Sequence, residues 1–216
     1  VVTTLLRSVE TVRNLTGNLA RYVTAPGIAD LAGTQTGRPA ILVAAGPSLG
    51  PALDRLADPA VRERAVIVSA QTTLRPLLAR GIRPHFVTAL DYHAISSRFY
   101  DGLRPADVAG IELVVDPKAH PSILESFPGT VRCCRAPLLD AILGDAARPM
   151  GELPPGATVA HLSAYLARHL GCDPIVTVGQ DLGFTDGLYY GPGAVIHETW
   201  EPELGTFTPI TSMEWQ

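Results

Sequence analysis

Short apolar runs alternate with helix-like stretches along most of this chain. The apolar runs lie at 40–45, 65–70, 85–90, 111–115, 130–134 and 174–179. They have the length of single strands and are continuously apolar, as expected for parallel strands covered on both faces. The stretches between them predict helices at 49–57, 72–80, 95–102, 120–127, 138–143 and 158–170. This alternation predicts an α/β fold with a Rossmann-like, doubly wound, mostly parallel sheet.

The first 24 residues predict an amphipathic helix that precedes the sheet. Apolar side chains recur there at steps of three and four, which forms one stripe along a helix: Leu5, Val9, Val12, Leu15, Leu19 and Tyr22. A loop rich in Pro and Gly follows this helix. We therefore expect a helix and linker at 1–37, the Rossmann-like domain at 38–193 and a C-terminal extension, cut short, at 194–216.

Composition narrows the class of protein. With 46% hydrophobic and 18% charged residues in 216, the chain is typical of a globular domain. A net charge of −4 and the lack of a basic run argue against nucleic acid as a partner. No apolar run approaches the roughly 20 residues of a membrane span, so we expect no membrane association. Three cysteines without paired spacing favour buried packing in a reducing cytoplasm.

The residues that follow each apolar run are the candidate site residues, because ligands of such sheets bind beyond the carboxyl ends of the strands. Gly46-Pro47-Ser48 follows the first run and precedes a predicted helix. A helix that begins there has unpaired N–H groups directed toward a bound phosphate, and the Ser48 hydroxyl is a further donor. The turn therefore predicts a phosphate site. The alternative is a plain strand-to-helix turn in which Ser48 caps the helix.

Polar side chains also follow the next three runs. Gln71 follows the second run, and Asp91 follows the third with a carboxylate suited to a metal ion, a ribose hydroxyl or a base edge. After the fourth run, Asp116, Lys118 and His120 offer a carboxylate, an ammonium and an imidazole. These groups suit acid–base and phosphate-contact chemistry. The alternative for each is an ordinary turn or helix-capping role.

The loop after the last run carries several polar groups among glycines, namely Gln180, Asp181, Thr185 and Asp186. That density of polar groups after a buried strand favours a functional loop, although Asp186-Gly187 is also a common turn signal. The last helix begins near Thr158, which predicts a second anion site or, alternatively, an ordinary N-cap.

Together these segments resemble the DUF115 family, which includes the motility-associated-factor (Maf) flagellin glycosyltransferases and the 6-hydroxymethylpterin pyrophosphokinase MptE-like proteins. The resemblance extends over most of residues 39–193. It is carried by Ala45-Gly46-Pro47-Ser48-Leu49, by Asp116-Pro117-Lys118 and above all by 170–175 running into Val178-Gly179-Gln180-Asp181-Leu182. Within the family, Gln180-Asp181-Leu182 is closer to the Maf branch.

The resemblance implies a cytoplasmic transferase, a glycosyltransferase core that binds a nucleotide-activated sugar. The Gly46-Pro47-Ser48-Leu49 turn also resembles the nucleotide-binding turn of bacterial sialyltransferases that use CMP-sialic acid, which implies a CMP-activated nonulosonic acid as the donor. The implied acceptor is a protein hydroxyl, such as one on flagellin. His120 or Asp181 is the candidate base, and no cofactor is required. The implied nucleotide-binding residues are Gly46, Pro47, Ser48, Gln71, Asp91, Asp116, Gln180 and Thr158.

Two alternatives stay open. The first is an MptE-like pyrophosphokinase that moves diphosphate from ATP to 6-hydroxymethyl-dihydropterin. This reaction requires Mg²⁺ held by Asp91, with Asp116 or Asp181 as a further candidate ligand. Tyr92-His93, rather than a second acidic residue, follows Asp91 and weakens this interpretation. The second alternative is a non-catalytic nucleotide-binding module, since a fold alone does not fix a function.

Overall fold

Six parallel strands form one sheet within residues 7–183, the part of the chain that this computed structural model describes. The strands occur in the order β5-β4-β3-β2-β1-β6. Their bounds are β1 (Ala40–Val43), β2 (Val66–Ala70), β3 (Phe86–Ala89), β4 (Glu112–Val115), β5 (Thr130–Cys133) and β6 (Ile175–Val178). Each strand falls within one predicted apolar run, which confirms the α/β, Rossmann-like fold. Every pairing among these strands is parallel.

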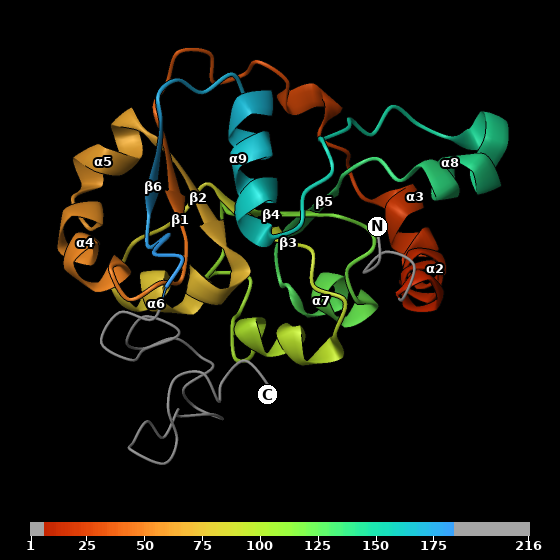
Figure 1. The fold of residues 1–216 in the computed structure, drawn as a ribbon, viewed down its shortest axis with the longest axis horizontal. Coiled ribbons are helices and arrows are strands. Elements are labelled where there is room, and N and C mark those ends of the chain that lie inside the picture. The colour runs from red at the N-terminus through yellow and green to blue at the C-terminus, as the bar shows by residue number, and fades with distance from the viewer. Residues whose placement is uncertain (1–6, 184–216) are drawn as a thin grey trace.

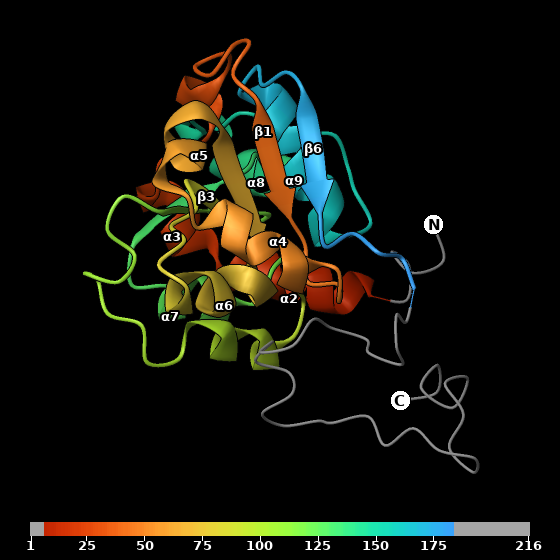
Figure 2. The same cartoon turned by 90° about the vertical axis from the view of Figure 1, so that its left-hand side faces the viewer.

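Helices cover both faces of the sheet (Figures 1 and 2). Helix α9 (Val159–His169) packs on one face through Leu162 and Leu166, against Leu42 and its neighbours. Helix α4 (Leu49–Leu56) packs on the other face, against the alternate side chains of β1 and β2. That second face is also covered by α6 (Leu74–Ala79), the 3₁₀ helix η3 (Ala94–Tyr100) and α7 (Pro121–Ser126). The sheet is therefore doubly wound.

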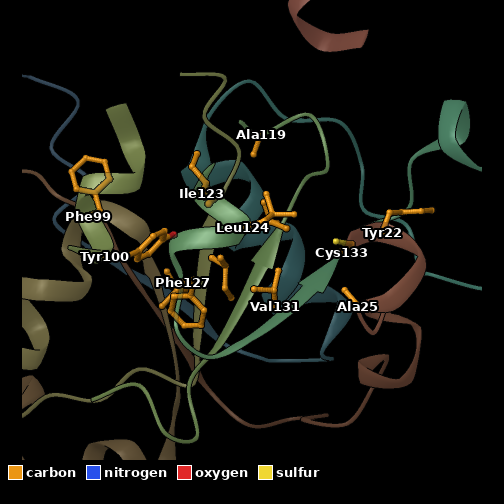
Figure 3. Close-up of a cluster of buried hydrophobic side chains, with 14 of the residues drawn as sticks. Tyr22, Ala25, Phe99, Tyr100, Ala119, Ile123, Leu124, Phe127, Val131 and Cys133 are labelled. Atoms are coloured by element: carbon orange, nitrogen blue, oxygen red, sulfur yellow. The ribbon is translucent and has the colours of Figure 1, made fainter. Parts of the chain in front are cut away.

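The largest hydrophobic cluster lies on this second face, over β3, β4 and β5 (Figure 3). Its centre is an edge-to-face aromatic pair in which the ring centroids of Tyr100 and Phe127 are 5.3 Å apart. Ile123 and Leu124 of α7 complete this part of the core, and both are fully buried. The cluster anchors η3 and α7, the two elements that follow β3 and β4.

Some predicted helices differ from the observed ones. The helix predicted at 95–102 is the 3₁₀ helix η3, and the one predicted at 72–80 begins with a 3₁₀ turn, η2 (Gln71–Thr73). Helix α5 (Pro59–Arg64) was not predicted, although Asp58 accepts a hydrogen bond from Ala60 N and Pro59 opens the helix, both ordinary start signals. The remaining elements are α8 (Pro137–Leu143), η1 (Ala29–Leu31) and η4 (Gly144–Ala146).

The predicted N-terminal helix is two helices, α2 (Ser8–Gly17) and α3 (Leu19–Thr24). The predicted apolar stripe is also wrong in its first half, because Val9 is 69% and Val12 48% exposed. Leu15 and Tyr22 are buried as expected, and Leu5 lies outside the described residues. None of the helices described is long and apolar enough to cross a membrane.

Two buried asparagines hold the N-terminal helices to the rest of the domain. Asn18 Nδ2 donates hydrogen bonds to the carbonyls of Pro117 and Ala119, both at 2.8 Å. Asn14 Nδ2 donates to the carbonyls of Lys118 at 3.0 Å and Tyr92 at 3.3 Å. Both side chains are at most 4% exposed. Hydrogen bonds to the loops after β3 and β4 therefore attach the N-terminal helices where the sequence predicted apolar contacts.

We predict that Asn18→Leu destabilises the fold by about 2–4 kcal/mol, because two carbonyls lose their donor in a site closed to water. Val12→Ala is the matched change on the same helix and should alter stability by no more than about 0.5 kcal/mol, since Val12 is half exposed. Urea denaturation of both variants checks this. Equal losses of unfolding free energy for the two variants would mean that Val12 contributes as much as Asn18, as the predicted apolar stripe requires.

His85, just before β3, is held neutral by its surroundings. Its Nδ1 accepts a hydrogen bond from Ile67 N at 3.0 Å. Burial, together with the nearby Arg62 and Arg38, lowers the pKa of this imidazole to about 4. In the unfolded chain the pKa returns to about 6.5. Between these two values the unfolded chain binds more protons than the folded one, so stability is lost as the pH falls from about 6.5 toward 4.

We predict that His85→Gln flattens this pH dependence, because glutamine keeps a hydrogen-bond acceptor but does not titrate. The free energy of unfolding, measured in urea at several values from about pH 7.5 to 4.5, should fall less steeply for the variant than for the wild type. Parallel curves for the two proteins would mean that His85 is not the titrating group.

Candidate functional site

The strand order reverses between β1 and β6. From β1 the chain adds β2, β3, β4 and β5 in one direction, and β6 then returns to the free edge of β1. In open α/β sheets such a reversal leaves a crevice beyond the carboxyl ends of the two strands, and ligands bind there. The segments that leave β1 and β6 at this point are Gly46-Pro47-Ser48 and Gly179-Gln180-Asp181.

Backbone contacts join these two segments closely. Ala44 N donates to Val178 O and Gly46 N donates to Gly179 O, both at 2.8 Å. Gly179 has a φ of +74°, and a side chain there would collide with the Ala44 carbonyl. A Cβ atom on Gly46 would lie 2.6 Å from Gly179 O and would also collide with the Asp181 carboxylate. Both positions therefore require glycine.

The Asp181 carboxylate occupies part of the predicted phosphate turn. Its Oδ2 accepts a hydrogen bond from the backbone N–H of Ser48 at 2.8 Å. The next two N–H groups are paired within the turn, Leu49 N with Gly46 O at 3.0 Å and Gly50 N with Pro47 O at 3.3 Å. The Ser48 side chain makes no capping bond to α4. A phosphate could reach the Ser48 N–H only if Asp181 moved away.

A pocket of about 320 Å³ opens beside these segments, between the sheet and the first half of α9. Gln180, from the loop after β6, and Thr158, at the start of α9, both line it, as the adjacent Leu182 does. The sheet contributes the carboxyl ends of β1 and β2 and the middle of β6. From these elements the lining residues are Leu42, Val43, Ala44, Ala70 and Thr177, and α9 adds Ala160, His161, Ser163 and Ala164.

Thr158 caps α9, as the ordinary alternative to an anion site predicts. Its Oγ1 accepts a hydrogen bond from His161 N at 3.4 Å and lies 2.8 Å from His161 Nδ1. His161 was not predicted from the sequence as a site residue. Its position three residues after the predicted N-cap Thr158 is the signal that could have found it.

The other predicted site residues gather at the ends of β3 and β4. Asp91 Oδ2 accepts a 2.6 Å hydrogen bond from Ser96 Oγ, and Asp116 Oδ1 accepts a 3.0 Å bond from Lys118 N. The Lys118 ammonium lies 3.6 Å from Asp116 Oδ2. His120 caps α7, because its Nδ1 accepts from Ser122 N at 3.3 Å. His120 N also donates to Asp91 O at 2.8 Å, so these residues form one group.

The two groups are far apart along the sheet edge. β4 and β6 are separated by four strand intervals, which at about 4.8 Å each span about 19 Å. Asp116 and His120 follow β4, whereas Asp181 follows β6. His120 and Asp181 therefore do not lie where both could act on one proton.

Gln71 lies between the two groups but is buried, at 1% exposure. Its Oε1 accepts a hydrogen bond from Tyr100 Oη at 3.3 Å, on the face opposite α9. Its side chain therefore belongs to the core beneath the site. Thr185 and Asp186 lie outside the described residues.

The three cysteines are free and buried, which confirms the packing interpretation. Burial raises the pKa of the Cys133 thiol to about 12 and raises the pKa values of Cys134 and Cys172 as well. Thiols of this kind are poor nucleophiles because little thiolate forms. In the described part of the chain, no three His, Cys, Asp or Glu side chains group as metal ligands.

Comparisons with known proteins agree with this architecture. The family model of the 6-hydroxymethylpterin diphosphokinase MptE-like proteins matches residues 13–187. The fold is similar to that of the MAf glycosyltransferase from Magnetospirillum magneticum AMB-1, with a TM-score of 0.61 and 24% sequence identity. That similarity covers 79% of this chain but 28% of the Magnetospirillum chain. No curated protein matches the chain significantly.

We predict that Gly46→Ala destabilises the protein by about 1–3 kcal/mol, because the new methyl group forces the 179–181 segment to move. Larger side chains at this position should disturb the fold further, so they cannot separate loss of binding from loss of structure. Gly50→Ala, in α4, is the matched control, because a Cβ there meets no atom within 4 Å. It should be neutral or stabilising by up to about 1 kcal/mol. Thermal unfolding measures the stability of both variants. A Gly46→Ala variant as stable as the wild type would contradict the close packing of Gly46 against the 179–181 segment.

Proposed function

Because this chain belongs to the 6-hydroxymethylpterin diphosphokinase MptE-like family, we propose that it is the core of a transferase whose nucleotide-activated donor binds in the pocket between β1, β6 and α9. The observation that carries this proposal is the coincidence of that pocket with the reversal of strand order. Its volume of about 320 Å³ is at the lower end of the range for small-molecule sites.

The reaction that we propose is glycosyl transfer from a CMP-activated nonulosonic acid. The pocket walls support a nucleoside there, because Leu42, Val43 and Leu182 offer apolar surface to a base. The Gln180 amide and the Thr177 hydroxyl offer hydrogen bonds to its edges or to the ribose. The similarity to the MAf glycosyltransferase supports the fold of such an enzyme. The acceptor in this proposal is a protein hydroxyl, such as one on flagellin, and the reaction is cytoplasmic.

Asp181 is the better placed of the two candidate bases. It borders the pocket through its neighbours Gln180 and Leu182, whereas His120 caps α7 at the end of the sheet near β4. In the proposed step the acceptor oxygen attacks the anomeric carbon of the donor sugar, and the bond from that carbon to the phosphate oxygen breaks. CMP leaves with the bonding electrons, and Asp181 takes the proton of the acceptor hydroxyl.

Donor binding would release Asp181 for this role. In the structure its carboxylate is held by the Ser48 N–H, which is also the N–H predicted to bind the donor phosphate. A phosphate that takes this N–H displaces the carboxylate into the crevice, where it can accept a proton. The Ser48 N–H, at the positive end of the α4 dipole, then stabilises the charge on the departing phosphate.

The family description itself supports a second candidate, a diphosphokinase, for which Mg²⁺ and ATP are the expectation from the sequence. This reaction needs carboxylates beside the triphosphate to hold the metal ion. Asp181 could serve as one, but Asp91 is two strand intervals from β1 and its carboxylate is held by Ser96. The pocket lining, within the described chain, contains no Asp or Glu side chain that could hold a metal ion, which favours the metal-free donor.

Calorimetric titration with CMP, ATP and GTP, each with and without Mg²⁺, tests the proposal. We predict binding of CMP that does not depend on Mg²⁺. Binding of ATP only in the presence of Mg²⁺ would favour the diphosphokinase, and nucleotide binding without turnover by the full-length protein would favour a non-catalytic module.

Asp181→Asn separates the roles of this residue in the same assay. We expect the variant to bind CMP at least as tightly as the wild type, because the competing charge at Ser48 N–H is removed. Transfer should be lost with the base. If Asp181 instead holds Mg²⁺ for ATP, the variant loses its Mg²⁺-dependent binding.

A further inference from the structure

The pocket between β1, β6 and α9 contains one ionisable side chain that the proposed reaction does not use. Of the described residues that line the pocket, His161 alone has an ionisable side chain. It lies in the first turn of α9, on the wall opposite the ends of β1 and β6. The described part of the lining offers no Lys or Arg side chain to the phosphate of a donor in this pocket.

Thr158 fixes the orientation of the His161 ring. Thr158 Oγ1 already accepts the backbone N–H of His161 at 3.4 Å, so its own proton is available for His161 Nδ1, 2.8 Å away. In the tautomer in which Thr158 donates to Nδ1, the ring carries its proton at Nε2. No hydrogen-bond partner contacts Nε2 within residues 7–183, so this N–H can donate to a ligand.

Two neighbours restrict the same ring further. The backbone at Gly156 packs so closely that a Cβ there would lie 2.6 Å from His161 Cβ. The ring of Tyr165, one turn along α9, has its centroid 6.2 Å from that of His161. His161 is therefore an exposed side chain whose position is defined by Thr158, Gly156 and Tyr165.

An anion meets different surroundings at His161 and at the Gly46-Pro47-Ser48 turn. At the turn, the Ser48 N–H is taken by the Asp181 carboxylate, which repels a phosphate until it is displaced. At His161 the first turn of α9 contains no acidic residue that would repel an anion. The positive end of the helix dipole attracts the anion to which the imidazole can donate a hydrogen bond.

We infer that His161 Nε2 donates a hydrogen bond to the phosphate of the donor nucleotide and so makes the pocket selective for nucleotides over nucleosides. This inference rests on the proposed function, because it assumes a nucleotide in the pocket. Thr158 acts as a positioning residue that holds Nδ1. The phosphate would then lie between His161 and the Ser48 turn, bridging the N-terminal ends of α9 and α4.

The test compares CMP with cytidine, which lacks only the phosphate, by NMR titration of the wild type and of three variants. We expect His161→Ala to weaken CMP binding about tenfold or more and to leave cytidine binding within about twofold. His161→Gln should recover much of the loss, because its amide can donate in a similar place. His169→Gln is the matched control in the same helix, since His169 lies at the far end and bonds to Ile28 O at 2.8 Å.

Several results would overturn the inference while leaving the proposed function intact. One is unchanged CMP binding by His161→Ala, and another is an equal loss for CMP and cytidine, which would place His161 against the base or ribose. If the wild type binds ATP instead of CMP, the same comparison is made with ATP and adenosine, and an equal loss for both in His161→Ala would overturn the inference. If the wild type binds neither CMP nor ATP, the proposed function fails and this inference fails with it.

Discussion

The pairing of β6 with β1 is the interaction on which the candidate site depends. These strands are more than 130 residues apart in the chain, yet their backbones are bonded from Ala40 beside Ile175 to Gly46 beside Gly179. Because β6 returns to the free edge of β1, two glycine-containing turns meet where the strand order reverses. Glycine at 46 and 179 allows that approach, and helix α9, which leads into β6, closes the far side of the pocket.

The same strand order divides the polar residues of the sheet edge into two groups. Gly46, Ser48, Gln180 and Asp181 surround the reversal, whereas Asp91, Asp116 and His120 follow strands two and three places further along. The residues of the second group stabilise turns and the N-terminal cap of α7. The Asn14 and Asn18 amides bind the loops of this group to the N-terminal helices. The reaction that we propose at the reversal therefore relies on few polar side chains, chiefly those of Asp181 and His161.

Local sequence patterns predicted the sheet well because its central strands, β1 to β4, are largely buried and all six strands occur as apolar runs, including the edge strand β6, in which Val176 is 50% exposed. They predicted the N-terminal helices poorly, because Val9 and Val12 fit a helical period while the docking is made by Asn14 and Asn18 through carbonyls about 100 residues away. The same limit applies to the site. The sequence identified the residues that follow each strand, but it did not predict that β6 lies beside β1. This strand order places Asp181, and not Asp116, next to Ser48.

The central claim is that the crevice between β1, β6 and α9 holds a nucleotide. A crystal structure of the protein with bound CMP tests it most directly. Our account predicts the ligand in the pocket beside Gln180 and His161, with Asp181 released from the Ser48 N–H. CMP bound instead at the ends of β3 and β4, beside Asp91 and Asp116, with the Asp181 contact intact, would contradict it.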